Sequence, residues 1–209
     1  MYTRYHLQIT TQALSRHFSE AALSEILKAN IFQDRPEGQF GHPFYHFDDS
    51  QFELTYRYLA SKKEMLLSAM QEHQPHLART CFGKITHAVQ DFYAHSNYLN
   101  LWKQKYNKTD FLAKDILISE IITDPNLISG RFYQPWEWIT FFPLIGPIAA
   151  RYFPKDSHAH MNLDSPKRGE LFQLAFQAAV LRTEYEYNEI ISSIGELGID
   201  YCKEFTDLP

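Results

Sequence analysis

Residues 83–97 read Gly-Lys-Ile-Thr-His-Ala-Val-Gln-Asp-Phe-Tyr-Ala-His-Ser-Asn. They contain no proline and no glycine after Gly83, which favours a helix. His87, Asp91 and His95 recur every four residues, so they form one stripe along a face of that helix. Imidazole nitrogens and a carboxylate oxygen in such a stripe suit Zn²⁺ or another borderline divalent metal ion. The stretch therefore predicts a helix that carries metal ligands.

The same stripe has a second interpretation, the solvated face of an amphipathic helix. The opposite face would then be the apolar one, and it carries Phe82, Ile85, Val89, Phe92 and Leu99. Against this interpretation, the ligand stripe continues into Tyr98 and Trp102, and solvated faces seldom continue as aromatic residues. The stripe alone leaves both interpretations open.

Length and composition limit the class of protein. The 209 residues are enough for one sizeable core. A hydrophobic content of 44% and an aromatic content of 15% indicate a folded chain. The net charge of −5 gives no electrostatic footprint for duplex nucleic acid. Two cysteines are too few for a disulfide framework, although a single bridge stays open.

The N-terminal residues and the lengths of the apolar stretches give an expectation for localisation. The N-terminal residues Met1–His6 lack the apolar core of a secretory signal, so we expect a cytoplasmic protein, with secretion by another route left open. No run of 18 uninterrupted apolar residues occurs, so we expect no transmembrane segment.

Apolar periodicity and cap residues predict the secondary structure. We expect Ser19 to cap the second helix, and Asp49 or Ser50 to cap the third. Prolines interrupt residues 125–157 and exclude a long helix there. No repeat and no strand pattern is visible, so we predict an all-α single domain over residues 1–209, a multi-helix bundle. Its main helices are expected at 3–15, from 19 to 30–34, at 51–72, 76–106 and 168–193, with a shorter apolar segment at 111–122.

Possible ligands occur in four separate regions of the chain. A lone histidine is more often a surface or hydrogen-bonded residue than a ligand, and we interpret His17, His42, His73 and His76 in that way. The remaining set exceeds the four ligands of one tetrahedral zinc and predicts a site for two or three ions, with Asp91 central enough to bridge. The set comprises His6, Asp34, His46, His87, Asp91, His95, His160 and Asp164.

Five motifs carry a resemblance to a known family. In chain order they are His6-Leu-Gln-Ile-Thr-Thr-Gln-Ala-Leu, the helix end Asn30–Asp34, His46-Phe-Asp, His87-x-x-x-Asp91 and His160-x-x-x-Asp164. On these motifs, residues 6 to about 180 resemble the zinc-dependent phospholipase C and single-strand nuclease superfamily. The run from His87 to Asn97 most resembles its Het-C (heterokaryon incompatibility) branch.

The resemblance implies an all-α bundle that holds three zinc ions in a cleft. It implies a first ion bound by Asp34, His46, His87 and Asp91. Asp91 would bridge to a second ion, held by His6 and by the amine and carbonyl of the N-terminal residue, Met1. The third ion would be held by His95, His160 and Asp164, and His158 could replace His160.

The resemblance also implies an activity, the zinc-dependent hydrolysis of phosphoric diesters in the manner of phospholipase C. Asp34 would orient the attacking water and Asp91 would bridge the metal ions as the second catalytic group. Two alternatives stay open. One is a Het-C-type metal-stabilised interaction or toxicity protein without catalysis, and the other is a single-strand nuclease.

The aromatic segment 132–153 bears on the choice of substrate. Only Arg131 and Arg151 supply cations beside it, whereas a nuclease cleft interleaves cations with aromatics. We therefore expect phospholipid or another phosphodiester as substrate in preference to nucleic acid. Residues 138–150 are apolar enough to contact a membrane surface. The alternative is that these side chains pack the domain core.

Overall fold

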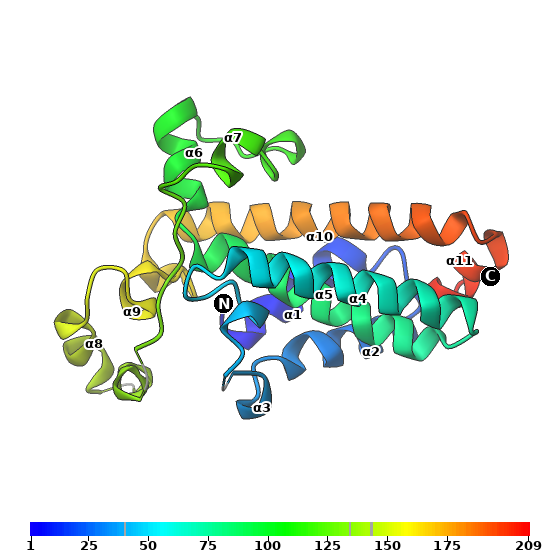
Figure 1. Cartoon of the computed structure of the whole chain (residues 1–209), viewed down its shortest axis with the longest axis horizontal. Helices are drawn as coiled ribbons and strands as arrows, with labels where there is room; N and C mark the ends of the chain where they lie inside the picture. Colours follow the sequence, from blue (N-terminus) through cyan, green and yellow to red (C-terminus); the bar gives the residue numbers. More distant parts are fainter. Residues whose placement is uncertain (40, 134, 143) are drawn as a thin grey trace.

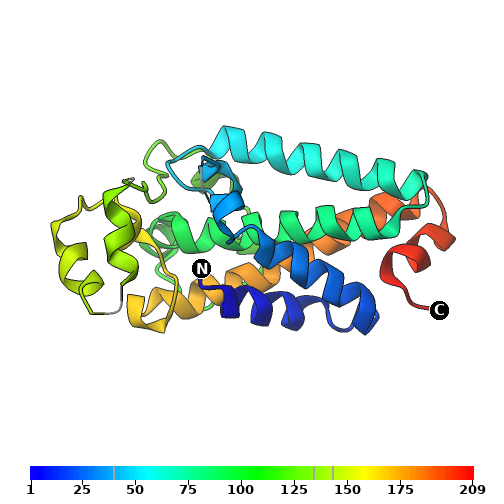
Figure 2. The same ribbon diagram turned by 90° about the horizontal axis from the view of Figure 1, so that it is seen from below.

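The computed structural model describes residues 1–39, 41–133, 135–142 and 144–209, and in these ranges the protein is an all-α multi-helix bundle, as predicted (Figure 1). Two isolated bridges, Ser96 with Ser129 and Arg131 with Ser157, are the extended pairings of the described residues. The bundle is elongated, and its long helices run along the main axis (Figures 1 and 2).

The bundle contains five principal helices and several short ones. The principal helices are α1 (Thr3–Leu14), α2 (Glu20–Phe32), α4 (Phe52–Gln71), α5 (Pro75–His95) and α10 (Leu171–Gly195). The others are α3 (Pro36–Gln39), η1 (Pro43–Tyr45), α6 (Tyr98–Tyr106), η2 (Ala113–Asp115), α7 (Ser119–Ile122), η3 (Trp136–Phe141), α8 (Gly146–Ala149), η4 (Ala150–Tyr152), α9 (His158–Met161), η5 (Pro166–Arg168) and α11 (Ile199–Thr206).

Helix α5 is the central element of the bundle. It packs against α2, α4 and α10, and every residue from Ile85 to His95 is buried. A helix that is covered on all sides has no solvated face. The interpretation of the His87–Asp91–His95 stripe as a wet face is therefore wrong, and the three polar side chains lie inside the protein.

Gly83 permits the close approach of α5 to α2. A Cβ atom at this position would lie 2.4 Å from the carbonyl oxygen of Ile26 and 2.7 Å from the Cβ of Ala29. Since both contacts involve backbone or a Cβ atom, neither can be relieved by rotation of a side chain. The helix pair depends on glycine here.

We expect Gly83→Ala to lower the free energy of unfolding by about 1–3 kcal/mol, because overpacking would push α2 away from α5. Urea denaturation measures the change. Gly195→Ala is the matched control, since its Cβ would meet only Cys202 Sγ at 3.9 Å. The control should be neutral or slightly stabilising, because alanine has the higher helix propensity. Equal stability of both variants and the wild type would contradict this account of the packing.

The prediction of one helix over residues 76–106 is wrong, because α5 ends at His95. Ser96 is extended, with φ −97° and ψ 163°, and its hydroxyl donates to the carbonyl of Phe92. The Asn97 backbone N–H donates to the carbonyl of Ile128, and its side chain accepts from the Ile128 N–H. These bonds to a distant segment turn the chain, so Tyr98 and Trp102 belong to α6 and do not continue the ligand stripe.

The cap predictions are half right. Ser19 caps α2 and accepts a hydrogen bond from the Ala22 N–H at 3.1 Å, as predicted. The predicted cap of α4 is wrong. The N-cap residue is Gln51, which makes no side-chain cap bond, while Asp49 accepts from the Phe132 N–H and Ser50 pairs with Ser129. These residues instead attach the start of α4 to the segment that follows α7.

The described residues 132, 133, 135–142 and 144–157 form a lobe at one end of the bundle, beyond the ends of α5 and α10 (Figures 1 and 2). Its elements η3, α8 and η4 are short, as the prolines predicted. Nowhere in the described ranges does a helix combine the length and apolar character needed to cross a membrane.

Candidate metal centre

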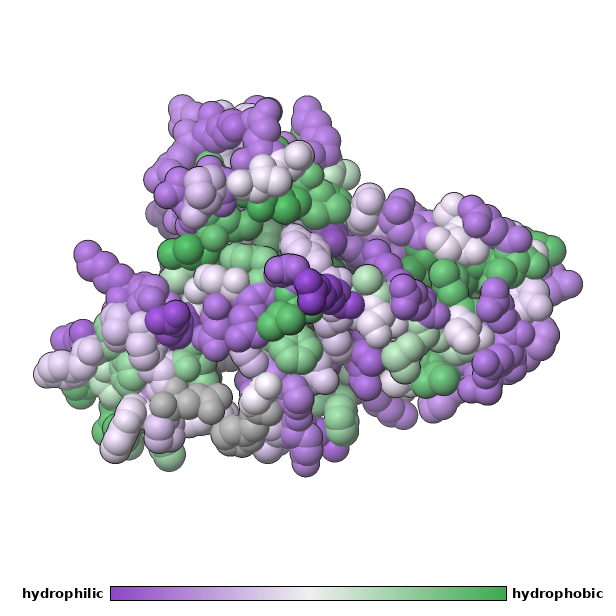
Figure 3. Space-filling view, viewed as in Figure 1, coloured by the Kyte–Doolittle hydropathy of each residue, from purple (hydrophilic) through white to green (hydrophobic). Residues whose placement is uncertain are grey.

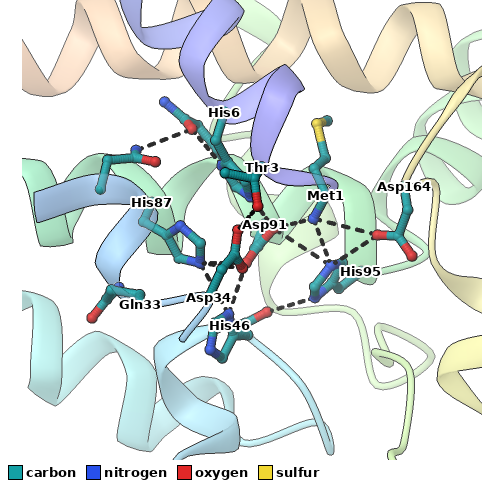
Figure 4. A network of polar contacts seen from close by, with 12 residues as sticks. Met1, Thr3, His6, Gln33, Asp34, His46, His87, Asp91, His95 and Asp164 are labelled. Atoms are coloured by element: carbon teal, nitrogen blue, oxygen red, sulfur yellow. Dashed lines mark hydrogen bonds and ion pairs between the residues drawn. The ribbon is translucent and has the colours of Figure 1, made fainter. Parts of the chain in front are cut away.

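Residues from five separate chain segments meet inside the bundle around the Asp91 carboxylate (Figure 4). The start of the chain and α1 bring Met1 and His6, the segment after α2 brings Asp34, and the residue after η1 is His46. Helix α5 brings His87, Asp91 and His95, and the segment after α9 brings Asp164. We call these eight residues the Asp91 cluster.

One oxygen of the Asp91 carboxylate, Oδ2, faces two histidines. It lies 3.0 Å from His87 Nε2 and 3.1 Å from His46 Nδ1, and the two nitrogens are 3.0 Å apart. Ligand atoms around a tetrahedral zinc with bonds of about 2.0–2.1 Å are separated by about 3.3 Å. The triangle therefore has nearly the size that three ligands of one ion require.

The other oxygen, Oδ1, faces a second group. It lies 2.5 Å from the Met1 nitrogen, 3.2 Å from His6 Nε2 and 3.4 Å from His95 Nε2. Asp164 Oδ1 completes this group at 3.3 Å from the Met1 nitrogen and 3.4 Å from His95 Nε2. Asp91 thus presents one oxygen to each group, which is the geometry of a bridging carboxylate.

The His6 ring is fixed by a buried polar network. Gln90 Oε1 accepts from His6 Nδ1 at 2.7 Å, while the Gln90 amide nitrogen donates to the hydroxyls of Thr10 and Thr183. Asn30 donates to the same Oε1, which confirms that this atom is the acceptor. Nδ1 is therefore occupied, and Nε2, which makes no hydrogen bond, faces Asp91 Oδ1 at 3.2 Å.

His95 is held in a similar way. Its Nδ1 lies 3.0 Å from Asp48 Oδ1 and 3.0 Å from the carbonyl oxygen of His46, so that nitrogen donates. Its Nε2 faces the oxygens of Asp91 and Asp164. A histidine whose outer nitrogen donates to a carboxylate or carbonyl is the usual arrangement for a metal ligand.

Without a cation the cluster holds excess negative charge. Burial acts to lower the pKa of His95, but the Asp91 and Asp48 carboxylates raise it to about 10. Burial would likewise lower the pKa of the Met1 amine, which Asp91 and Asp164 raise to about 11. The pKa of Asp91 is driven well below its ordinary value against the effect of burial, chiefly by His95 and the amine. The carboxylates still outnumber these two positive groups.

His87 carries no such charge. Burial, followed by the electrostatic effect of neighbouring His6, lowers the pKa of His87 to about 4. Its Nε2 lies 3.7 Å from Asp34 Oδ1, and Asp34 is oriented by the Thr3 hydroxyl, which donates to Oδ2 at 3.0 Å. A neutral imidazole is the form that binds metal ions.

The structure brings His158, and not His160, to the cluster. Ligand atoms of His95, His158 and Asp164 all lie within 4.8 Å of one another. His160 is exposed and lines a separate surface pocket with Arg168. The reason is that α9 ends at Met161 and Asn162 is extended, so the predicted helical pair His160-x-x-x-Asp164 does not form. Of the two alternatives that the sequence left open, the structure places His158 at the cluster and His160 away from it.

Two buried polar residues escaped the sequence prediction. Asp48 lies two positions after His46 and orients His95, and Gln90 precedes Asp91 and orients His6. For Gln90 the residue type gave one signal, because a buried polar side chain in a central helix needs a hydrogen-bond partner, whereas Asp48 lies outside any helix. The identity of those partners depends on the tertiary structure.

The cluster opens to a cavity of about 1040 Å³. His46, Asp48, His95 and Asp164 form its floor, and Phe132, Tyr133 and Trp138 of the lobe line one wall. Part of the cluster can therefore be reached from solvent, namely Met1, Asp34, His46, His95 and Asp164, whereas His6, His87 and Asp91 do not line the cavity.

A family model for the VWA7 N-terminal domain matches residues 3–128 of the chain, which is more than half of it. The chain belongs to the VWA7 N-terminal domain family. The matched segment contains helices α1 to α7 and so includes the Asp91 cluster except for Met1 and Asp164.

Similar proteins include the von Willebrand factor A domain-containing protein 7 of rat, mouse and human. The rat and mouse proteins are 35% identical over 91 residues, and the human protein is 37% identical over 93 residues. Each match covers 44% of this chain and 10% of the relative, so the chain spans only a small part of the length of these proteins. No solved structure matches the chain significantly.

Membership of the VWA7 N-terminal domain family overturns the predicted resemblance. The chain is not shown to be a zinc-dependent phospholipase C or single-strand nuclease, nor a Het-C protein, because the family model and the three relatives are of another kind. The predicted hydrolysis of phosphoric diesters and both of its alternatives are wrong on the same finding. The catalytic roles of Asp34 and Asp91 lose their basis with that activity, whereas their positions in the cluster do not depend on it.

Proposed function

We propose that this VWA7 N-terminal domain binds two or three divalent metal ions, zinc by ligand type, in the Asp91 cluster. One observation carries the proposal. His6 and His95 each have Nδ1 occupied by a fixed acceptor, and each directs Nε2 at the same oxygen of Asp91, at 3.2 and 3.4 Å. Two imidazole nitrogens and a carboxylate oxygen that converge in this way form a donor set suited to a divalent metal ion.

The proposed assignment follows the two oxygens of Asp91. One ion takes Oδ2 with His46, His87 and Asp34. A second takes Oδ1 with His95 and Asp164, and His6, the Met1 nitrogen and His158 lie around it. Imidazole combined with carboxylate is a ligand set typical of zinc, whereas magnesium and calcium prefer oxygen ligands alone.

Binding would neutralise the buried carboxylates and join the five segments that meet at Asp91. Because an unfolded chain presents no such site, the free energy of metal binding adds to the free energy of unfolding. The cavity beside the cluster gives the ions a route from solvent. The function that these features support is metal-dependent stabilisation of the domain.

The test is elemental analysis of protein purified without chelator. We expect two to three equivalents of zinc. Chelation should then lower Tm by about 5–10 °C, since a few kcal/mol corresponds to about 2–4 °C for each kcal/mol in a domain of this size. Restoring zinc should restore Tm. Less than one equivalent of any divalent metal, with identical melting curves in excess chelator, would overturn the proposal.

A further inference from the structure

The lobe at the end of the bundle exposes several large apolar side chains, and hydrophobic atoms are visible along its outer edge in Figure 3. We define the apolar lobe as residues 135–142 and 144–153. Leu144 is 89% exposed, Tyr152 85% and Trp136 77%. Other exposed apolar residues of the lobe are Ile139, Phe142, Ile145 and Ile148. Side chains exposed to this degree project from the surface, so the alternative interpretation, that they pack the domain core, does not describe them.

The backbone of the apolar lobe holds these side chains outward. Glu137 is fully buried, and its carboxylate accepts from the Tyr133 N–H at 2.8 Å and the Ala159 N–H at 2.6 Å. Gly146 lies so close to η3 that a Cβ atom there would be 2.1 Å from the carbonyl oxygen of Thr140. The lobe is therefore a compact folded unit, and its apolar residues are exposed by its own packing.

The fully exposed charges beside the apolar lobe in the sequence are cationic. Arg131, Arg151 and Lys155 are exposed. Of the acidic residues in and next to this stretch, Glu137 is buried, and Asp156 is half-buried and accepts from the Tyr133 hydroxyl. The chain as a whole carries −5, so this cationic border runs against the overall charge. A surface that combines exposed apolar side chains with cations complements an anionic lipid interface.

The aromatic residues fit the same partner. Tryptophan and tyrosine are enriched at the level of lipid headgroups, because each has an apolar ring and a polar atom. Trp136 and Tyr152 flank the apolar residues Phe142 to Ile148 in the sequence. The lobe also lies at one end of the long axis, so the bundle does not block its approach to a plane (Figures 1 and 2).

We infer that the apolar lobe inserts into the surface of membranes that contain anionic lipids. The inserted side chains are Trp136, Phe142, Leu144, Ile145, Ile148 and Tyr152, and Arg151 and Lys155 contact the headgroups. The inference does not rest on metal binding, because none of these residues belongs to the Asp91 cluster.

Sedimentation with vesicles tests the inference. The whole chain is mixed with phosphatidylcholine vesicles with and without phosphatidylserine. We expect binding that is stronger with phosphatidylserine and that weakens as salt is added. Leu144→Glu should weaken binding about tenfold or more. The matched control is Ile199→Glu in α11, which is 70% exposed at the other end of the bundle and should bind as the wild type does.

A charge series and a fluorescence readout complete the test. Arg151→Gln with Lys155→Gln should weaken binding to phosphatidylserine vesicles about tenfold, whereas the exposed pair Lys28→Gln with Lys114→Gln should not. Tryptophan emission should shift to the blue on binding, and Trp136→Phe should reduce that shift. Absence of binding to both kinds of vesicle would overturn the inference. The inference would also be overturned if the control variants lost vesicle binding to the same extent. It would equally be overturned if the chain bound no vesicles and formed a dimer that Leu144→Glu converted to monomer.

Discussion

Asp91→Ala is expected to remove at least one equivalent of metal and to lower Tm by about 10 °C in the presence of zinc. Asp91 supplies an oxygen to each ligand group, so its loss weakens both sites at once. Ligand-linked stabilisation is worth about 4 kcal/mol at a thousand times the dissociation constant. At about 2–4 °C for each kcal/mol, this gives the expected change in Tm. Elemental analysis and thermal unfolding, each with and without chelator, measure the effect.

Asp115→Ala is the matched control for this experiment. Asp115 is also buried, and its carboxylate accepts from the Leu112 N–H at the start of η2, away from the cluster. The control should keep its full metal content, and its Tm should still fall on chelation. An Asp91→Ala variant with wild-type metal content would refute the bridging role of Asp91.

Glu186→Gln is expected to lower the free energy of unfolding by about 3 kcal/mol, or about 6–12 °C in Tm. Glu186 and Arg182 are buried neighbours on α10, joined at 2.7 Å, and Lys63 of α4 contacts the same carboxylate at 2.7 Å. The amide has nearly the same shape, but it leaves the Arg182 guanidinium without a counter-charge in the interior. Urea denaturation at neutral pH measures the loss.

Glu53→Gln is the matched control, because Glu53 and Arg57 form an exposed pair at the same helical spacing. Its effect should stay within about 0.5 kcal/mol. Replacing both partners, Arg182→Met with Glu186→Leu, should cost less than Glu186→Gln alone. If the buried and exposed single variants were equally stable, the Arg182–Glu186 pair would not stabilise α10.

The stabilisation that Glu186 contributes should depend on pH in a definite direction. Burial acts to raise the pKa of Glu186, but Arg182 and Lys63 hold it below its ordinary value of about 4.3. A carboxylate with a depressed pKa in the folded state stabilises fully above its unfolded pKa, and this stabilisation is lost as the pH falls through the folded pKa. The difference between wild type and Glu186→Gln should therefore be constant above about pH 5 and shrink below about pH 4.

Local patterns predicted the parts of the structure that local interactions determine. The helical stretch around Asp91 and the cap at Ser19 follow from residue type and spacing, and both are found. The end of α5 at His95 depends on bonds to Asn126 and Ile128, about thirty positions later, which no periodicity reveals. The choice between His158 and His160 likewise depends on where α9 stops.

The family prediction failed for a different reason. Histidines and aspartates at helical spacing express the chemistry of metal binding, and that chemistry can occur on unrelated folds. The predicted ligands His6, His46, His87 and Asp91 do meet in space, while the family assigned from the same motifs is wrong. Ligand spacing therefore predicted the cluster without determining the family.

The early end of α5 has an electrostatic consequence. The aligned peptide dipoles of a helix place partial negative charge at its C-terminus, and this charge acts within the last turn. His95 lies in that last turn because the helix stops at Ser96, and Asp91 lies one turn before it, facing the same cluster. A cation held there gains about 0.3–1 kcal/mol, and up to about 2 kcal/mol where the site is partly buried. In the longer helix that the sequence predicted, both residues would lie mid-helix, and α5 would contribute almost nothing to holding a cation.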